Sequence, residues 1–105
     1  MSVTYLVGFK VKAEQHDRFR RLLDAVLDAM REEESFRNAT LHRHPDDPFS
    51  YLLHESWADH EEVLEVQLKR PYRAEWHAAL PELLEQPRDI SMWVPIRADG
   101  QIMNP

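Results

Sequence analysis

The hydrophobic pattern changes its period once within the first 34 residues, and this change constrains the fold more than any other feature of the sequence. In residues 3–11, VTYLVGFKV, every odd position is apolar, and this period of two indicates a strand with one buried face. Between residues 13 and 34 apolar side chains recur three and four positions apart, which predicts a long amphipathic helix. The apolar stripe of that helix consists of Phe19, Leu22, Leu23, Val26, Leu27 and Met30.

The rest of the chain reads as two strands, two helical segments and a last strand. The predicted strands are 36–44, 49–57 and 90–96, and the helical segments are 59–68 and 71–86. A turn with two prolines around two aspartates separates the second and third strands, because proline fixes φ and cannot donate to a ladder. Asp59 followed by Glu62 resembles a capping box, and we expect the helix after it to bury Val63 and Leu64.

This order, β-α-β-β-α-β, predicts a ferredoxin-like α+β fold with an antiparallel sheet. One face of the sheet packs on the helices. The other face is also partly apolar, since Leu6, Trp93 and either Leu41 or Leu52 fall on it. A second copy of the chain is the simplest cover for that face, so we expect a homodimer. Residues 1–97 form one domain in this prediction, and 98–105 form a polar tail.

Composition excludes several classes of function. The net charge is −6 with scattered Lys and Arg, which argues against nucleic acid and anionic membranes as partners. No apolar run is long enough to span a bilayer, and no signal-peptide pattern is present, so we expect a cytoplasmic protein. The chain contains no Cys and two Gly, which leaves no thiolate site and no glycine-rich nucleotide loop. We therefore expect no cofactor.

The third strand ends in Glu55-Ser56-Trp57, which places a carboxylate and an indole on the same face. A carboxylate buried beneath the helices would have a raised proton affinity and could act as an acid or a base. The alternative is structural: Glu55 forms an ion pair at the end of the strand, and Trp57 belongs to the core.

The segment 70–80, RPYRAEWHAAL, is the second candidate site. Tyr72 and Trp76 are four residues apart and share a helix face, and His77 lies beside them. Rings opposite Trp57 would line a slot for a planar aromatic ligand, in which His77 could accept a phenolic proton. The alternative is an aromatic core stripe with His77 at its edge.

The other histidines do not specify a metal site. His42, His44 and His54 would share a sheet face in only one register of the hairpin, and a shift of one residue separates them. His16 and His60 flank helix starts, where we expect them to be solvated. We predict no metal.

The element order, the Glu55-x-Trp57 motif and the Pro71-Tyr72 turn resemble the antibiotic biosynthesis monooxygenase family over residues 3–96. The resemblance implies a dimeric α/β barrel with a pocket between the sheet and helices of each subunit. It also implies oxygenation of a quinol or anthrone by O₂ without metal or flavin, because the deprotonated substrate supplies the electrons. In that scheme His77 is the base and Tyr72 orients the phenol.

The resemblance further assigns Trp57 and Trp76 to the two sides of the aromatic ring, with Glu55 holding a polar partner. Leu53 and Val7 stand where relatives carry an Asn toward the pocket, and both are predicted to contact substrate. The histidine that relatives often carry on the helix after the third strand is replaced here by Val66 or Gln67, which is a further departure from the family pattern.

Two other functions stay open. The first is an isomerase similar to the autoinducer-2 processing branch, which has a comparable Pro-Arg pair before its last strand. Pro87 and Arg88 match that pair, and Arg73 with Arg88 could bind the phosphate of such a substrate. The second is a non-catalytic dimeric domain that binds a small ligand. The sequence specifies neither substrate nor product.

Overall fold

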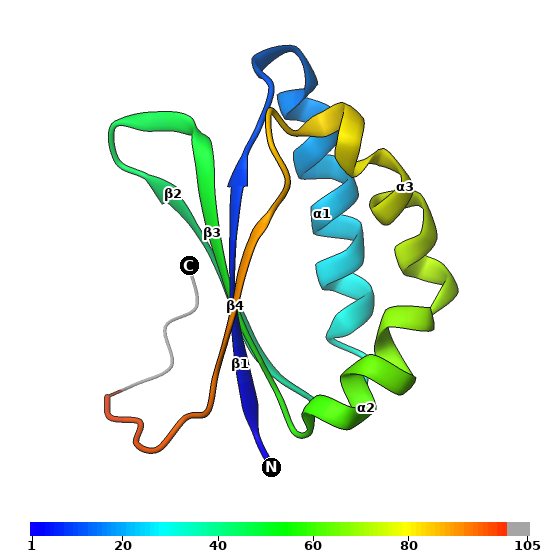
Figure 1. Cartoon of the computed structure of the whole chain (residues 1–105), viewed down its shortest axis with the longest axis vertical. Helices are drawn as coiled ribbons and strands as arrows, with labels where there is room; N and C mark the ends of the chain where they lie inside the picture. The colour runs from blue at the N-terminus through cyan, green and yellow to red at the C-terminus, as the bar shows by residue number, and fades with distance from the viewer. Residues whose placement is uncertain (101–105) are drawn as a thin grey trace.

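The computed structural model describes residues 1–100, and these form a four-stranded antiparallel sheet with all helices on one face (Figure 1). The strands are β1 (Val3–Lys10), β2 (Phe36–His44), β3 (Asp47–Trp57) and β4 (Asp89–Trp93). Their order across the sheet is β2-β3-β1-β4. The predicted ferredoxin-like α+β fold is confirmed. The predicted tail, 98–105, lies outside the described residues from 101 onward.

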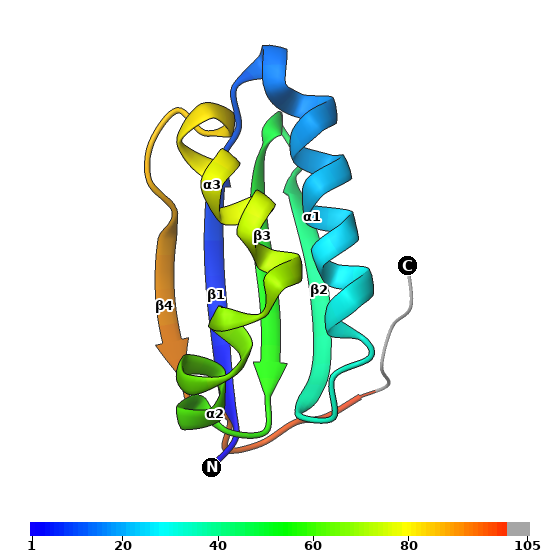
Figure 2. The same ribbon diagram turned by 90° about the vertical axis from the view of Figure 1, so that its right-hand side faces the viewer.

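Helices α1 (His16–Met30) and α3 (Ala74–Leu83) lie side by side across the sheet, and α2 (His60–Glu65) lies near the end where β3 finishes (Figure 2). Three 3₁₀ turns join them: η1 (Ala13–Gln15), η2 (Gln67–Lys69) and η3 (Pro71–Arg73). Pro71 begins η3, as expected for a residue without an N–H to satisfy. The predicted 59–68 helix is therefore shorter, ending at Glu65, and the first predicted helix divides into η1 and α1.

The core lies between the sheet and the helices. The odd residues of β1 face the helices, and Val3, Val7 and Phe9 are buried. The register aligns Val7 with Leu53 of β3 and with Ile90 of β4, so these three side chains share the helix-facing side. Phe9, Phe19 and Trp76 pack edge to face or tilted, with ring centroids 5.2 to 5.8 Å apart.

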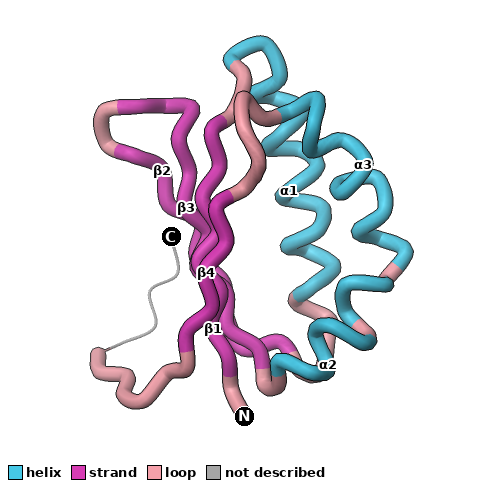
Figure 3. The backbone as a smooth tube through the Cα atoms, in the orientation of Figure 1, coloured by secondary structure: helices cyan, strands magenta, loops and turns pink. Residues whose placement is uncertain are grey.

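The opposite face of the sheet carries no helix within residues 1–100 (Figure 3). Leu52 and Trp93 lie on this outer face and are 43% and 58% exposed. Leu41 pairs with Leu53 and so faces the helices, which resolves the choice that the sequence left open. The prediction that α2 buries Leu64 is wrong for the single chain, because Leu64 is 45% exposed while Val63 is buried.

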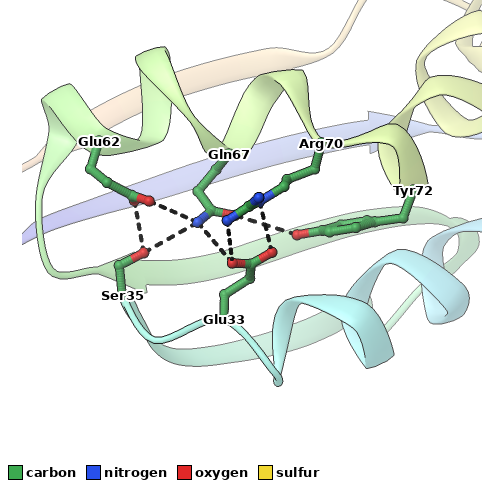
Figure 4. Close-up of polar contacts among 6 residues, drawn as sticks. All are labelled: Glu33, Ser35, Glu62, Gln67, Arg70 and Tyr72. Atoms are coloured by element: carbon green, nitrogen blue, oxygen red, sulfur yellow. Dashed lines mark hydrogen bonds and ion pairs between the residues drawn. The ribbon is translucent and has the colours of Figure 1, made fainter.

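A polar network fastens α2 and η2 to the end of α1 (Figure 4). Gln67 is 1% exposed, and its Nε2 lies within bonding distance of Glu62 (2.9 Å), Glu33 (3.1 Å) and Ser35 (3.4 Å). The Ser35 hydroxyl donates to the second oxygen of Glu62 at 2.7 Å. Arg70 closes the network with both guanidinium contacts on Glu33, at 3.1 and 3.2 Å. These bonds hold the short, weakly helical segment 60–70 in place.

We expect Gln67→Leu to lower the free energy of unfolding by about 1–3 kcal/mol, because it removes the buried amide that donates to the half-buried side chains of Glu33, Glu62 and Ser35. Urea unfolding followed by tryptophan fluorescence measures the change. Gln86→Leu is the matched control, since Gln86 is exposed, and it should shift the value by less than about 0.5 kcal/mol. Equal effects of the two variants would contradict a stabilising role for the network.

Candidate active site

A cavity of about 380 Å³ lies between the sheet and the helices, within the size range of small-molecule sites. Its walls come from every strand except β2 and from all three α-helices. The apolar lining residues are Val7, Phe9, Leu23, Val26, Met30, Leu53, Val63, Leu64, Leu68, Trp76, Ile90 and Met92. Six polar or charged side chains complete the lining: Tyr5, Glu55, His60, Arg73, His77 and Arg88.

Glu55 is the only carboxylate in this lining. It lies on β3 opposite Tyr5 of β1, one alternation before Trp57. The indole Nε1 of Trp57 donates to its Oε1 at 3.1 Å. Burial raises the pKa of Glu55, and the bond from Trp57 and the charges of Arg73 and Arg88 oppose this rise without cancelling it. The site therefore holds a carboxyl group that takes up a proton more readily than one in water.

Two guanidinium groups line the same cavity. Arg73, at the end of η3, is 6% exposed, and its group lies 5.7 Å from the ring of Trp57 and 5.5 Å from that of Tyr72. Its Nε and Nη2 are buried and find no hydrogen-bond partner anywhere in residues 1–100. Arg88, half-buried in the loop before β4, has a pKa lowered by burial and by Arg73, against the opposing charge of Glu55.

His77, on α3, contributes the imidazole. Burial lowers its pKa below the ordinary value of 6.5, and the positive charges of Arg88 and Arg73 lower it further. Its ring is therefore neutral at pH 7 and able to accept a proton. The same side chain also lines a second hollow, between α3 and the loop 84–88, which shares Arg88 with the main cavity.

The predicted site residues divide into two groups. Glu55, His77, Trp76, Leu53 and Val7 all line the cavity and so come together as the sequence suggested. Their predicted roles are a separate matter and stay predictions.

Trp57 and Tyr72 do not come to the cavity wall, so the predicted pair of indoles around a ring does not form. Trp57 is fully buried at the end of β3, where its ring packs on Phe36 and beneath Arg73. Tyr72 turns away toward the polar network, and its hydroxyl is 3.5 Å from Gln67. The E-x-W spacing correctly places Glu55 and Trp57 on one face, but it does not specify how far the cavity extends along the strand.

Tyr5 and His60 are cavity residues that the sequence reading missed. The Tyr5 hydroxyl lies 2.6 Å from Nδ1 of His60, which corrects the expectation that His60 is solvated. His16 is likewise bonded, to the hydroxyl of Tyr51. Burial, with the negative charges of Glu55 and Asp59, raises the pKa of Tyr5. The signal available in the sequence was the hydroxyl of Tyr5 on a strand face that is otherwise wholly apolar.

The hairpin register places His42 and His54 on the outer face, where they pair with Leu52 and Thr40. A register shift between Arg43 and His44 precludes a regular row of three. No group of three or more His, Asp or Glu side chains suited to a metal occurs within the described part of the chain.

Residues 2–79 match the family model described as antibiotic biosynthesis monooxygenase. The match spans most of the chain, and the protein belongs to that family. No curated protein sequence matches the chain. None of the helices in residues 1–100 has the length and apolar character needed to cross a membrane.

Solved structures agree on the fold. Rv0793 from Mycobacterium tuberculosis superposes with a TM-score of 0.85 at 22% identity, covering 95% of this chain and 100% of that one. A putative antibiotic biosynthesis monooxygenase from Nitrosomonas europaea gives 0.82 at 16% identity, covering 92% and 100%. SnoaB from Streptomyces nogalater, described as a cofactor-independent oxygenase, gives 0.78 at 21% identity, covering 92% and 95%.

Proposed function

We propose that the protein is a monooxygenase that uses O₂ without a cofactor, on a small aromatic quinol- or anthrone-like compound. The observation that carries the proposal is an apolar cavity in which a neutral imidazole, His77, lies near two guanidinium groups. Family membership and the likeness to SnoaB, a cofactor-independent oxygenase, support this reaction class.

The proposed reaction begins when His77 removes an acidic proton from the substrate. The resulting anion is electron-rich, and the guanidinium groups of Arg73 and Arg88 stabilise its charge in a site with little water. Electrons pass from this anion to O₂, and a carbon–oxygen bond forms at the ring carbon. The oxygen–oxygen bond then breaks. In an anthrone one oxygen atom stays as a new carbonyl and the other leaves as water with the two hydrogens of the oxidised CH₂ group, so the balance is R₂CH₂ + O₂ → R₂CO + H₂O. A quinol reacts at a ring CH and gives a hydroxyquinone with the same use of O₂, which for the parent compound is C₆H₆O₂ + O₂ → C₆H₄O₃ + H₂O.

The remaining lining residues bind and orient the substrate. Trp76 forms an aromatic wall, and Leu53 and Val7 contact the substrate from the sheet. Glu55, with its raised proton affinity, holds a hydroxyl or carbonyl of the substrate. Tyr5 lines the cavity and Tyr72 does not, so the hydroxyl of Tyr5 takes the role of orienting the substrate that the sequence assigned to Tyr72.

The proposal includes the assembly and location predicted from the sequence. The outer sheet face, with Leu52 and Trp93 exposed, is where a second copy of the chain would pair to form a homodimer. The partners are then this second copy, the aromatic substrate and O₂, in the cytoplasm.

Oxygen uptake by the purified protein tests the function. Reduced quinols and anthrones are supplied one at a time in the presence of a chelator, and an oxygen electrode records the rate. We expect at least one compound to be consumed well above its spontaneous rate, with one O₂ used per molecule oxidised. Rates equal to the spontaneous ones across the panel would count against an oxygenase and favour an isomerase or a binding domain.

A further inference from the structure

The charged groups of the central cavity do not balance. Arg73 and Arg88 bring two positive charges, and Glu55 brings at most one negative charge. Within residues 1–100 neither guanidinium lies within 4.0 Å of the Glu55 carboxylate, so neither forms an ion pair with it. The cavity therefore carries an excess of positive charge, although the net charge of the whole chain is −6. This positive charge is a property of the cavity and not of the surface.

Arg73 is costly to bury in this form. The residue is only 6% exposed, yet Nε and Nη2 of its guanidinium donate to no group in residues 1–100. A guanidinium that is desolvated without an acceptor is destabilised, and its contacts with the rings of Trp57 and Tyr72 offset only part of this cost. The rings hold the planar group in one orientation, with Nε and Nη2 each exposing less than 1 Å² of surface, so an acceptor in the cavity reaches them only when a neighbouring side chain shifts.

The two free donors, Nε and Nη2, lie on one edge of the guanidinium. This edge matches the two oxygens of a carboxylate, which accepts such a pair in parallel. The rest of the cavity is apolar and aromatic, which suits a hydrocarbon ring system and not a free inorganic anion.

We propose that the ligand of this cavity is an aromatic carboxylic acid, bound as its carboxylate by Arg73 with Arg88 and enclosed by the apolar walls. The inference rests on the proposed function for the identity of the cavity as the substrate site, and it narrows the substrate to an aromatic compound that carries an acid group. The carboxylate anchors the molecule, and a separate position on the ring reacts.

Binding of a matched pair of probes tests the inference. Naphthalene-2-carboxylate and naphthalene-2-carboxamide have the same ring and nearly the same shape, and isothermal titration at pH 7 measures their affinities. We expect the carboxylate to bind at least about tenfold more tightly, since hydrogen bonds to a charged group contribute about 1.5–3 kcal/mol. Inorganic phosphate alone should bind at least tenfold more weakly than the carboxylate.

Variants test whether the two arginines cause the preference for the carboxylate probe over the carboxamide probe. Arg73→Met should reduce the preference to within about twofold, and Arg88→Met should weaken it. Arg88 is half-buried in a loop, so its variant keeps the test decisive if Arg73→Met fails to fold. Arg21→Met, on the exposed side of α1, is the control and should leave the preference unchanged. Equal affinities for the two probes, a preference that survives in both cavity variants, or equally tight binding of phosphate would overturn the inference.

The two proposals fail separately. Carboxylate preference with no oxygen uptake on any acidic quinol would support this inference and remove the oxygenase. Equal turnover of acidic quinols and their amides, with no difference in affinity, would support the oxygenase and overturn this inference.

Discussion

Replacing His77 by Gln is expected to lower the rate of oxygen uptake with an accepted quinol by about 10²- to 10⁴-fold, the usual contribution of a positioned general base. Gln keeps much of the volume and polarity of the imidazole but cannot take a proton at neutral pH. The oxygen electrode gives the rate, and titration of the naphthalene probe shows that the cavity still binds. His42→Gln, on the exposed outer face, is the control. Unchanged turnover would remove His77 from the role of base.

The pH dependence supplies a second test of the same residue. A base acts in its neutral form, so the rate should rise with pH through the pKa of His77 and then level off. Because burial and the charges of Arg88 and Arg73 lower that pKa, the rise should be centred below 6.5. Arg88→Met removes one of these charges and should move the rise toward higher pH. A rise centred above 6.5, or one that Arg88→Met moves downward, would contradict the assignment.

The sequence predicts the fold because its two periodicities are unambiguous over long stretches. The period of two in β1 and the stripe in α1 each fix which side is buried, and a register error would expose that whole side. Boundaries are less well determined between residues 60 and 74. That stretch divides into α2, η2 and η3, and its position depends on Gln67 and its contacts with Glu33 and Ser35, which are distant in sequence.

The site is only partly predictable, for a related reason. Alternation specifies that Glu55 and Trp57 face the helices, and helical spacing places Trp76 and His77 near them. Neither rule specifies at which residues of β3 the helices lie far enough from the sheet to leave a cavity. Trp57 lies beyond that point, beneath η3, and is part of the core. The charges that define the cavity, Arg73 and Arg88, come from a turn and a loop, where no periodicity applies.

Trp57→Ala is expected to lower the free energy of unfolding by about 3–5 kcal/mol, the usual cost of deleting a large buried aromatic side chain. Trp57 is fully buried, and its ring supports both Phe36 and the guanidinium of Arg73. Urea unfolding measures the loss. Trp93→Ala is the matched control: Trp93 is 58% exposed, and at protein concentrations low enough to separate any paired sheet faces the change should stay within about 0.5 kcal/mol. A loss below 1 kcal/mol for Trp57→Ala would contradict its place in the core.

Because of that loss, inactivity of Trp57→Ala would not show that the indole contacts substrate. Trp57→Phe separates the two effects, since it keeps a buried ring but removes the N–H that donates to Glu55. That bond lowers the pKa of Glu55 against the effect of burial, so its removal should raise this pKa further. If Trp57 acts through Glu55, the variant stays folded, and the pH dependence that belongs to Glu55 moves to higher pH with a moderate loss of turnover. A folded variant with an unchanged pH profile would show that Trp57 has only a structural role.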